Sequence, residues 1–246
     1  MSLSLETEWT LAACGLVALA DGVFNGGEAG RVLDMVHSLV PPAEQDAWID
    51  DITSRESMQA RLDALAAPPA DAPERILRRA WAIALVDGEG SQDEARVLES
   101  IGERLGRARD EVATWRKLWT SHAVETAGHV AGFAALLMHR RAAASPTPGD
   151  LPGPEDRDAF HRLLARLPLS EARRLRLHKL LDEPGSVEDL GHALLWLGPE
   201  RRDEVLREIA TYIRTAGAGP LGRQLFLALA ARMAVREDLA ARYLDP

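Results

Sequence analysis

Cysteine, tyrosine and phenylalanine are scarce in this chain of 246 residues, which has one, two and four of them respectively. A single thiol, Cys14, excludes a framework of internal disulfides. Because Cys14 lies in an apolar run, we expect it to be buried. Strands favour aromatic and β-branched residues, whereas Ala, Leu, Arg and Glu, which favour helices, dominate here. The composition therefore predicts an all-α fold without a sheet.

Long apolar runs are also missing. The longest, Val130 to Met138, is far shorter than the roughly 20 residues that a membrane-spanning helix needs. The first residues include Glu6 and Glu8, where a secretory leader would be basic. We therefore expect a soluble, cytoplasmic protein with no transmembrane segment.

The motifs of common enzymes are absent as well. The chain has no Gly-rich phosphate loop, no nucleophile elbow and no His-Glu pair of a zinc protease, so we expect no enzyme. Residues 1–145 carry 14 basic against 22 acidic side chains, and residues 146–246 carry 15 against 16. This acidity argues against nucleic acid as a partner and leaves metal cations or a basic protein surface.

Apolar residues recur at the three-to-four-residue spacing of helices along most of the chain. Helices are predicted over residues 7–20, 28–39, 43–53, 56–66, 73–86, 92–105, 109–139, 155–166, 170–182, 187–197, 200–215 and 221–243. Between Ala142 and Glu155, four prolines and two glycines predict a long loop or linker. This divides the chain into a domain over 1–141, a loop or linker over 142–154 and a second domain over 155–246.

A short motif occurs twice in the first half. Asp21-Gly22 precedes Glu28 by the same spacing with which Asp87-Gly88 precedes Glu94. Each copy follows an apolar helical segment and precedes an amphipathic one, so each predicts a helical hairpin.

The start of each second helix carries a capping signal. Asn25 and Ser91 are natural N-caps, and the glutamates three residues on complete capping boxes. Gly22 and Gly88 are natural helix stops. Capping and turn geometry alone therefore account for the glutamates.

The aspartates need more explanation, because a carboxylate at a helix C-terminus meets the negative end of the helix dipole. A positive partner is expected there: the amides of the next helix, an arginine or a bound cation. If the hairpins pack about a two-fold axis, four carboxylates converge, those of Asp21, Glu28, Asp87 and Glu94. Without His or Cys, such a cluster would suit Ca²⁺ or Mg²⁺.

A longer repeat is visible at an offset of 127 to 129 residues. Residues 28–44 align with 155–171, and residues 61–105 align with 190–234. This repeat predicts that the second half is a diverged copy of the first.

The Asp-Gly…Glu turns at the elbows of two helical hairpins resemble the TerB family of tellurite-resistance proteins. The resemblance covers residues 9–106 well and 155–243 only as a degenerate copy. It implies a compact helical bundle, Asp21, Glu28, Asp87 and Glu94 as candidate ion ligands, and a place in stress response, tellurite resistance or phage defence. In the second copy Ala216 stands for Asp87 and Arg223 for Glu94, and Glu155 alone stays acidic. That copy is therefore expected to have kept the fold and lost the ion site.

Three further groups have a structural and a functional interpretation. His122, Glu125 and His129 share one helix face, which is either a solvated polar face or a metal site. Trp115 and Trp119, like the other tryptophans, are expected in the core, with an exposed protein-binding anchor as the alternative. Residues 171–179 form a basic stripe with the arginines Arg173, Arg174 and Arg176. The stripe is either a solvated helix face or a docking surface for the acidic first half, for an acidic partner or for an anionic surface.

These features predict a non-enzymatic, tandem TerB-like scaffold that engages other proteins and holds Ca²⁺ or Mg²⁺ in its first half. One alternative is a metal-dependent hydrolase that uses the same carboxylates with His122 or His129 as a proton carrier. Another is a purely structural adaptor whose acidic elbow is a docking patch.

Overall fold

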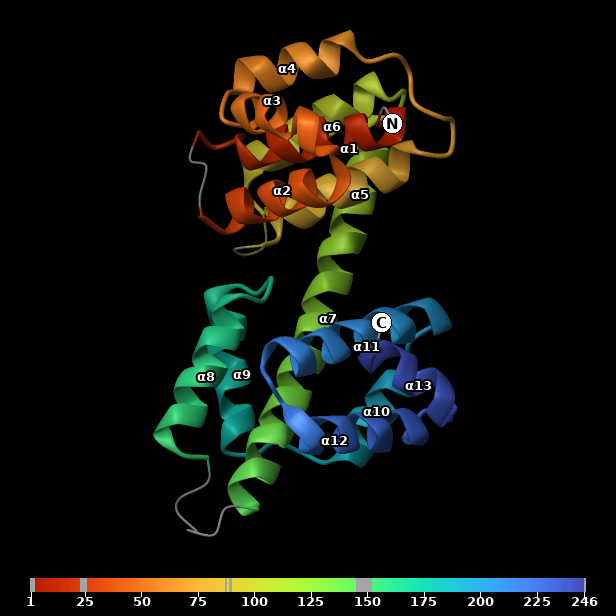
Figure 1. Cartoon of the computed structure of the whole chain (residues 1–246). Helices are drawn as coiled ribbons and strands as arrows, with labels where there is room; N and C mark the ends of the chain where they lie inside the picture. Colours follow the sequence, from red (N-terminus) through yellow and green to blue (C-terminus); the bar gives the residue numbers. More distant parts are fainter. Residues whose placement is uncertain (1–2, 23–25, 87, 89, 145–151, 246) are drawn as a thin grey trace. The chain divides into compact units, whose positions relative to one another are not determined.

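The computed structural model describes residues 3–22, 26–86, 88, 90–144 and 152–245. Within these ranges every regular element is a helix and no strand occurs, so the predicted all-α class is confirmed. The helices form two compact units, residues 1–121 and 122–246 (Figure 1). The boundary falls inside one long helix, at residue 121, whereas the sequence placed the end of the first domain at residue 141.

The described residues of the first unit form six complete helices and the start of a seventh. They are α1 (Leu5–Ala18), α2 (Gly26–Leu39), α3 (Pro42–Ile52), α4 (Arg55–Ala64), α5 (Pro73–Ala84), α6 (Gln92–Arg104) and α7 (Arg109–Ala143), of which α7 continues into the second unit.

Helix α1 is the central element of the first unit. It contacts each of α2, α3, α4, α5 and α6. Every residue from Trp9 to Ala18 is buried, because the helix is apolar on all sides. Cys14 lies in this stretch as expected, and burial raises the pKa of its thiol to about 12.

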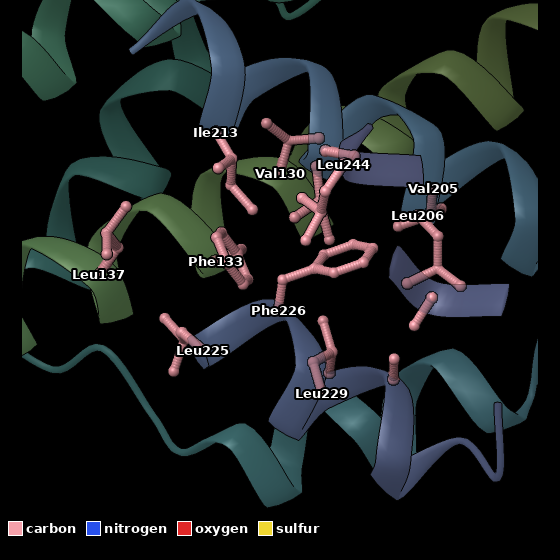
Figure 2. Packing of buried hydrophobic residues seen from close by; sticks show 14 of the residues in the cluster. Val130, Phe133, Leu137, Val205, Leu206, Ile213, Leu225, Phe226, Leu229 and Leu244 are labelled. Carbon is pink, nitrogen blue, oxygen red and sulfur yellow. The ribbon is translucent and has the colours of Figure 1, made fainter. Parts of the chain in front are cut away.

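In the second unit, the residues that the structure describes form the end of α7 and six further helices. They are α8 (Pro154–Ala165), α9 (Glu171–His178) with a 3-10 turn (Lys179–Leu181), α10 (Val187–Leu195), α11 (Pro199–Thr215), α12 (Gly219–Arg232) and α13 (Glu237–Leu244). Figure 2 shows Phe133 of α7 and Phe226 of α12 in one apolar cluster with Ile213 of α11. A second cluster joins α7 to Phe160 and Leu164 of α8.

The predicted helix ends mostly agree with the observed ones, with one clear exception. Residues 221–243 were expected to form a single helix, but α12 ends at Arg232 and α13 begins at Glu237. Ala234 in the connection has a φ of 55°, a left-handed conformation that is uncommon for a residue other than glycine. Nothing in its residue type announces the break.

In the part of the chain that the structure describes, no helix is both long enough and apolar enough to cross a membrane.

Candidate functional site

The elbow between α5 and α6 is built around Ser91 and Glu94. Ser91 is the N-cap of α6, and the backbone N–H of Glu94 donates to Ser91 Oγ over 3.1 Å. In return, the backbone N–H of Ser91 donates to Glu94 Oε2. The predicted capping box is therefore present.

Glu94 is buried more deeply than a capping role requires. Its residue is 5% exposed, and its second carboxylate oxygen, Oε1, has no hydrogen-bond partner. Among the described residues only one other charged side chain is equally buried, that of Glu28, which is 3% exposed in the first turn of α2. The two glutamates chosen from the repeated motif are thus the buried acids of the described structure.

Gly90 fixes the backbone that leads into this elbow. It has a φ of 78°, and an added Cβ would lie 2.4 Å from Cη2 of Trp81. The Trp81 indole N–H donates to Thr120 Oγ1 over 2.9 Å, which ties α5 to α7 within the first unit. Gly88 was expected to stop the helix, but Gly90 is the glycine of this turn with a positive φ.

The elbow between α1 and α2 has Asp21 exposed just beyond the end of α1. Gly22 has a φ of 77°, as expected for a helix stop. The guanidinium of Arg55 approaches the same helix end, with Nη1 donating to the Ala20 carbonyl over 3.5 Å. An arginine is therefore present at the helix terminus where a positive group was predicted. The predicted N-cap, Asn25, lies outside the described residues.

The two elbows lie on the same side of the first unit. Ala20 at the end of α1 and Asp93 in the first turn of α6 line one groove. In Figure 1, α1 and α5 also end on the same side of the unit. Asp87, the fourth predicted ligand, lies outside the described residues. Within the described ones, no group of three or more His, Cys, Asp or Glu is placed to hold a metal ion.

The corresponding positions in the second unit hold no buried acid. Ala216 is exposed at the end of α11, and Glu155 is exposed in the first turn of α8. Arg223 in α12 forms an exposed ion pair with Asp245, with Nη2 2.9 Å from Oδ2. The second unit thus has no counterpart of the buried pair Glu28 and Glu94.

The histidine-containing face of α7 contributes to the packing of the second unit. Arg201 of α11 donates to Glu125 Oε2 over 3.4 Å, to Thr126 Oγ1 over 3.0 Å and to the His122 carbonyl over 2.7 Å. Burial lowers the pKa of His129, with a smaller opposing effect from Glu125. Glu125 is therefore engaged by an arginine.

The tryptophans divide between core and surface. Trp119 is 6% exposed and its ring centroid lies 5.9 Å from that of Trp115, which is half-buried, so core packing describes the pair better than an exposed anchor. Trp196 was expected in the core, but it is 91% exposed after the end of α10. Its position at a helix end, outside the periodic apolar face, explains the difference.

The predicted basic stripe lies on α9, a helix with no buried residue. Arg173 and Arg176 are exposed and Arg174 is half-buried. Leu175 between them is 63% exposed. The stripe is therefore a surface feature with an apolar residue in its middle.

In the first unit, the fold and the elbows define an all-helical bundle of hairpins with a buried carboxylate, Glu28 or Glu94, in the first turn of the second helix of each hairpin. Residues 7–117 match the family model of tellurite resistance protein TerB, so this part of the chain is similar to that family. Comparison with curated proteins and with solved structures found no match.

Proposed function

We propose that the chain is a non-enzymatic adaptor whose first unit binds Ca²⁺ or Mg²⁺ at its two elbows. The ligands are the carboxylates of Glu28 and Glu94, completed by Asp21 and Asp87. The cation controls the shape of the elbows, and other surfaces of the chain engage protein partners.

The observation that carries this proposal is the unpartnered Oε1 of Glu94. A buried carboxylate oxygen without a hydrogen-bond partner is costly, so a compensating positive group is expected. Capping uses Oε2 alone and leaves Oε1 available. Hard divalent cations take carboxylate oxygens as ligands, and a second buried glutamate occupies the corresponding place in the other hairpin.

The order of the helices supports an internal duplication. At the offsets of the sequence repeat, α2 and α3 correspond to α8 and α9, and α5 and α6 correspond to α11 and α12. The end of α7 then takes the place of α1 and packs against α11 and α12, as α1 packs against α5 and α6. We infer that the second unit is a TerB-like copy that kept the packing without the buried acids.

The exposed face of α9 is our candidate partner surface in that copy. Its arginines Arg173, Arg174 and Arg176 flank the exposed Leu175, and they suit an acidic protein partner. By its TerB domain we place the adaptor in bacterial tellurite resistance, stress response or phage defence.

The alternative, a metal-dependent hydrolase, would need a histidine beside the same carboxylates. His122 and His129 belong to the second unit, whereas the carboxylates belong to the first. No observation in the structure favours this alternative.

The test is the thermal stability of the full chain with and without Ca²⁺. A cation at one hundred times its dissociation constant stabilises the folded state by about 2.7 kcal/mol. For a chain of this size we expect the Tm to rise by about 5 to 10 °C. Chelator should reverse the rise, and isothermal titration calorimetry should give the stoichiometry.

Glu94→Gln separates the cation from the cap, because Gln also completes a capping box. We expect this variant to fold and to lose the calcium effect, as should Asp21→Ala/Asp87→Ala. Glu155→Gln, at the corresponding exposed position of the second unit, is the matched control and should keep the effect. A wild-type Tm that neither Ca²⁺ nor Mg²⁺ changes would refute the ion site.

A further inference from the structure

A groove in the first unit gathers three arginines beside the elbows. It has a volume of about 390 Å³ and lies between the end of α1, helix α4 and helix α6. This volume is within the range of about 300 to 1,000 Å³ that is typical of small-molecule sites.

Three guanidinium groups line this groove. Arg55 begins α4, Arg96 lies in the first half of α6, and Arg104 ends α6. Among the described lining residues Asp93 is the sole carboxylate. The unit as a whole holds 12 basic against 21 acidic residues. The groove is therefore rich in positive charge although the unit has a net negative charge.

The arginines keep donors for a ligand. Arg55 donates to the Ala20 carbonyl over a long 3.5 Å, and it forms no ion pair with any residue that the structure describes. Arg96 pairs with Asp93 over 2.8 Å, and both side chains are more than half exposed. Arg104 pairs with Asp63, which lies outside the groove lining and also accepts from Gln59. Each guanidinium has five N–H donors, so most of them remain for an incoming anion.

Leu16 of α1, Leu62 of α4 and Ile101 of α6 also line the groove, but each is at most 2% exposed. The surface that the groove offers to a ligand is therefore mainly polar, and the arginines determine which ligands it can bind.

We propose that this groove binds a small phosphate monoester. A phosphate monoester has three acceptor oxygens, so it can accept hydrogen bonds from more than one of the arginines that line the groove at once. A monocarboxylate presents two oxygens and would engage fewer of the donors. This site adjoins the elbows, since Ala20 and Asp93 line the same groove, but its ligands are arginines rather than the buried acids of the proposed cation site.

The probe is phenyl phosphate, titrated into the full chain by isothermal titration calorimetry at low ionic strength with chelator present. Chelator removes any contribution from a cation at the elbows. We expect saturable binding of one phenyl phosphate per chain, with benzoate about tenfold weaker or worse. No saturable binding of phenyl phosphate, or benzoate binding equally well, would overturn the proposal.

Arg55→Gln and Arg96→Gln test the site itself, because each removes a charged guanidinium group while keeping a polar side chain. Each should weaken binding by about tenfold or more, and the double variant should abolish it. Arg109→Gln is the matched control: Arg109 is an exposed arginine of the same unit that pairs with Glu103 away from the groove. A loss with Arg109→Gln as large as with Arg55→Gln would show nonspecific charge attraction. Circular dichroism melts confirm that each variant is folded.

Discussion

At the scale of single residues, the two elbows differ in how tightly their glycines are packed. Gly22 and Gly90 have nearly the same φ, 77° and 78°. A Cβ at Gly22 would meet nothing within 4 Å, whereas one at Gly90 would overlap the Trp81 ring. Comparing a substitution at Gly22 with one at Gly90 therefore separates the free-energy cost of a left-handed backbone from that of a steric clash.

Gly90→Ala should destabilise the protein by about 3 kcal/mol, from a left-handed penalty of roughly 1–2 kcal/mol and overpacking against Trp81. Gly22→Ala carries the backbone penalty alone and should cost about 1 kcal/mol. Urea unfolding of both variants measures the difference. Equal losses would mean that the Trp81 contact contributes nothing.

The candidate site could be predicted in part at this scale. The repeated motif identified Glu28 and Glu94, and the residue types of Ser91 and Glu94 predicted their capping box. The burial of both glutamates could not be predicted, because a capping glutamate at a helix start is commonly solvated. It depends on the packing of distant helices, which no local pattern encodes.

At the scale of the elements, the periodicity of apolar residues located almost every helix. It failed after Arg232, where Ala234 takes a left-handed conformation and splits one expected helix into α12 and α13. An alanine favours helix locally, so only the tertiary packing of α13 against α11 and α12 explains the turn. The same limit applies to Trp196, whose exposure follows from its place beyond the end of α10.

The contact between α11 and α7 through Arg201 lends itself to a test. The Arg201 side chain is 14% exposed and donates to the His122 carbonyl and to Thr126 Oγ1. Arg201→Met should lower the free energy of unfolding by about 2 kcal/mol, because buried hydrogen-bonding groups lose a charged partner.

Arg207→Met is the matched control in the same helix. Arg207 is 67% exposed and pairs with Asp203, an arrangement worth about 0–1 kcal/mol. Denaturant unfolding followed by circular dichroism compares the two variants. Similar losses would contradict a specific role for Arg201.

At the scale of the whole molecule, charge and packing divide the chain in the same way. Residues 1–121 hold 12 basic and 21 acidic side chains, which accounts for the formal net charge of −9 of the full chain. The two apolar clusters of the second unit contain no residue of the first. The sequence predicted this asymmetry of charge, but it placed the boundary at the Pro/Gly-rich stretch because it could not show which contacts the residues of α7 make.

Residues 1–121 expressed alone should therefore fold into a helical unit with a cooperative thermal transition. Its buried residues from Trp9 to Ala18 are surrounded by helices of the same unit. Circular dichroism and thermal melting check this, and the fragment should keep the calcium response of the full chain. A fragment without a cooperative transition would show that the second unit is needed for folding.

The proposed role of the buried Glu94 also limits which residues can replace it in related chains. A helix start that needs only a cap accepts Gln or Asp there as readily as Glu, so related chains would drift among them. A carboxylate whose free oxygen neutralises a cation cannot lose its charge in this way. The residue types found at position 94 in related chains would therefore show whether selection has acted on the capping of α6 or on cation binding.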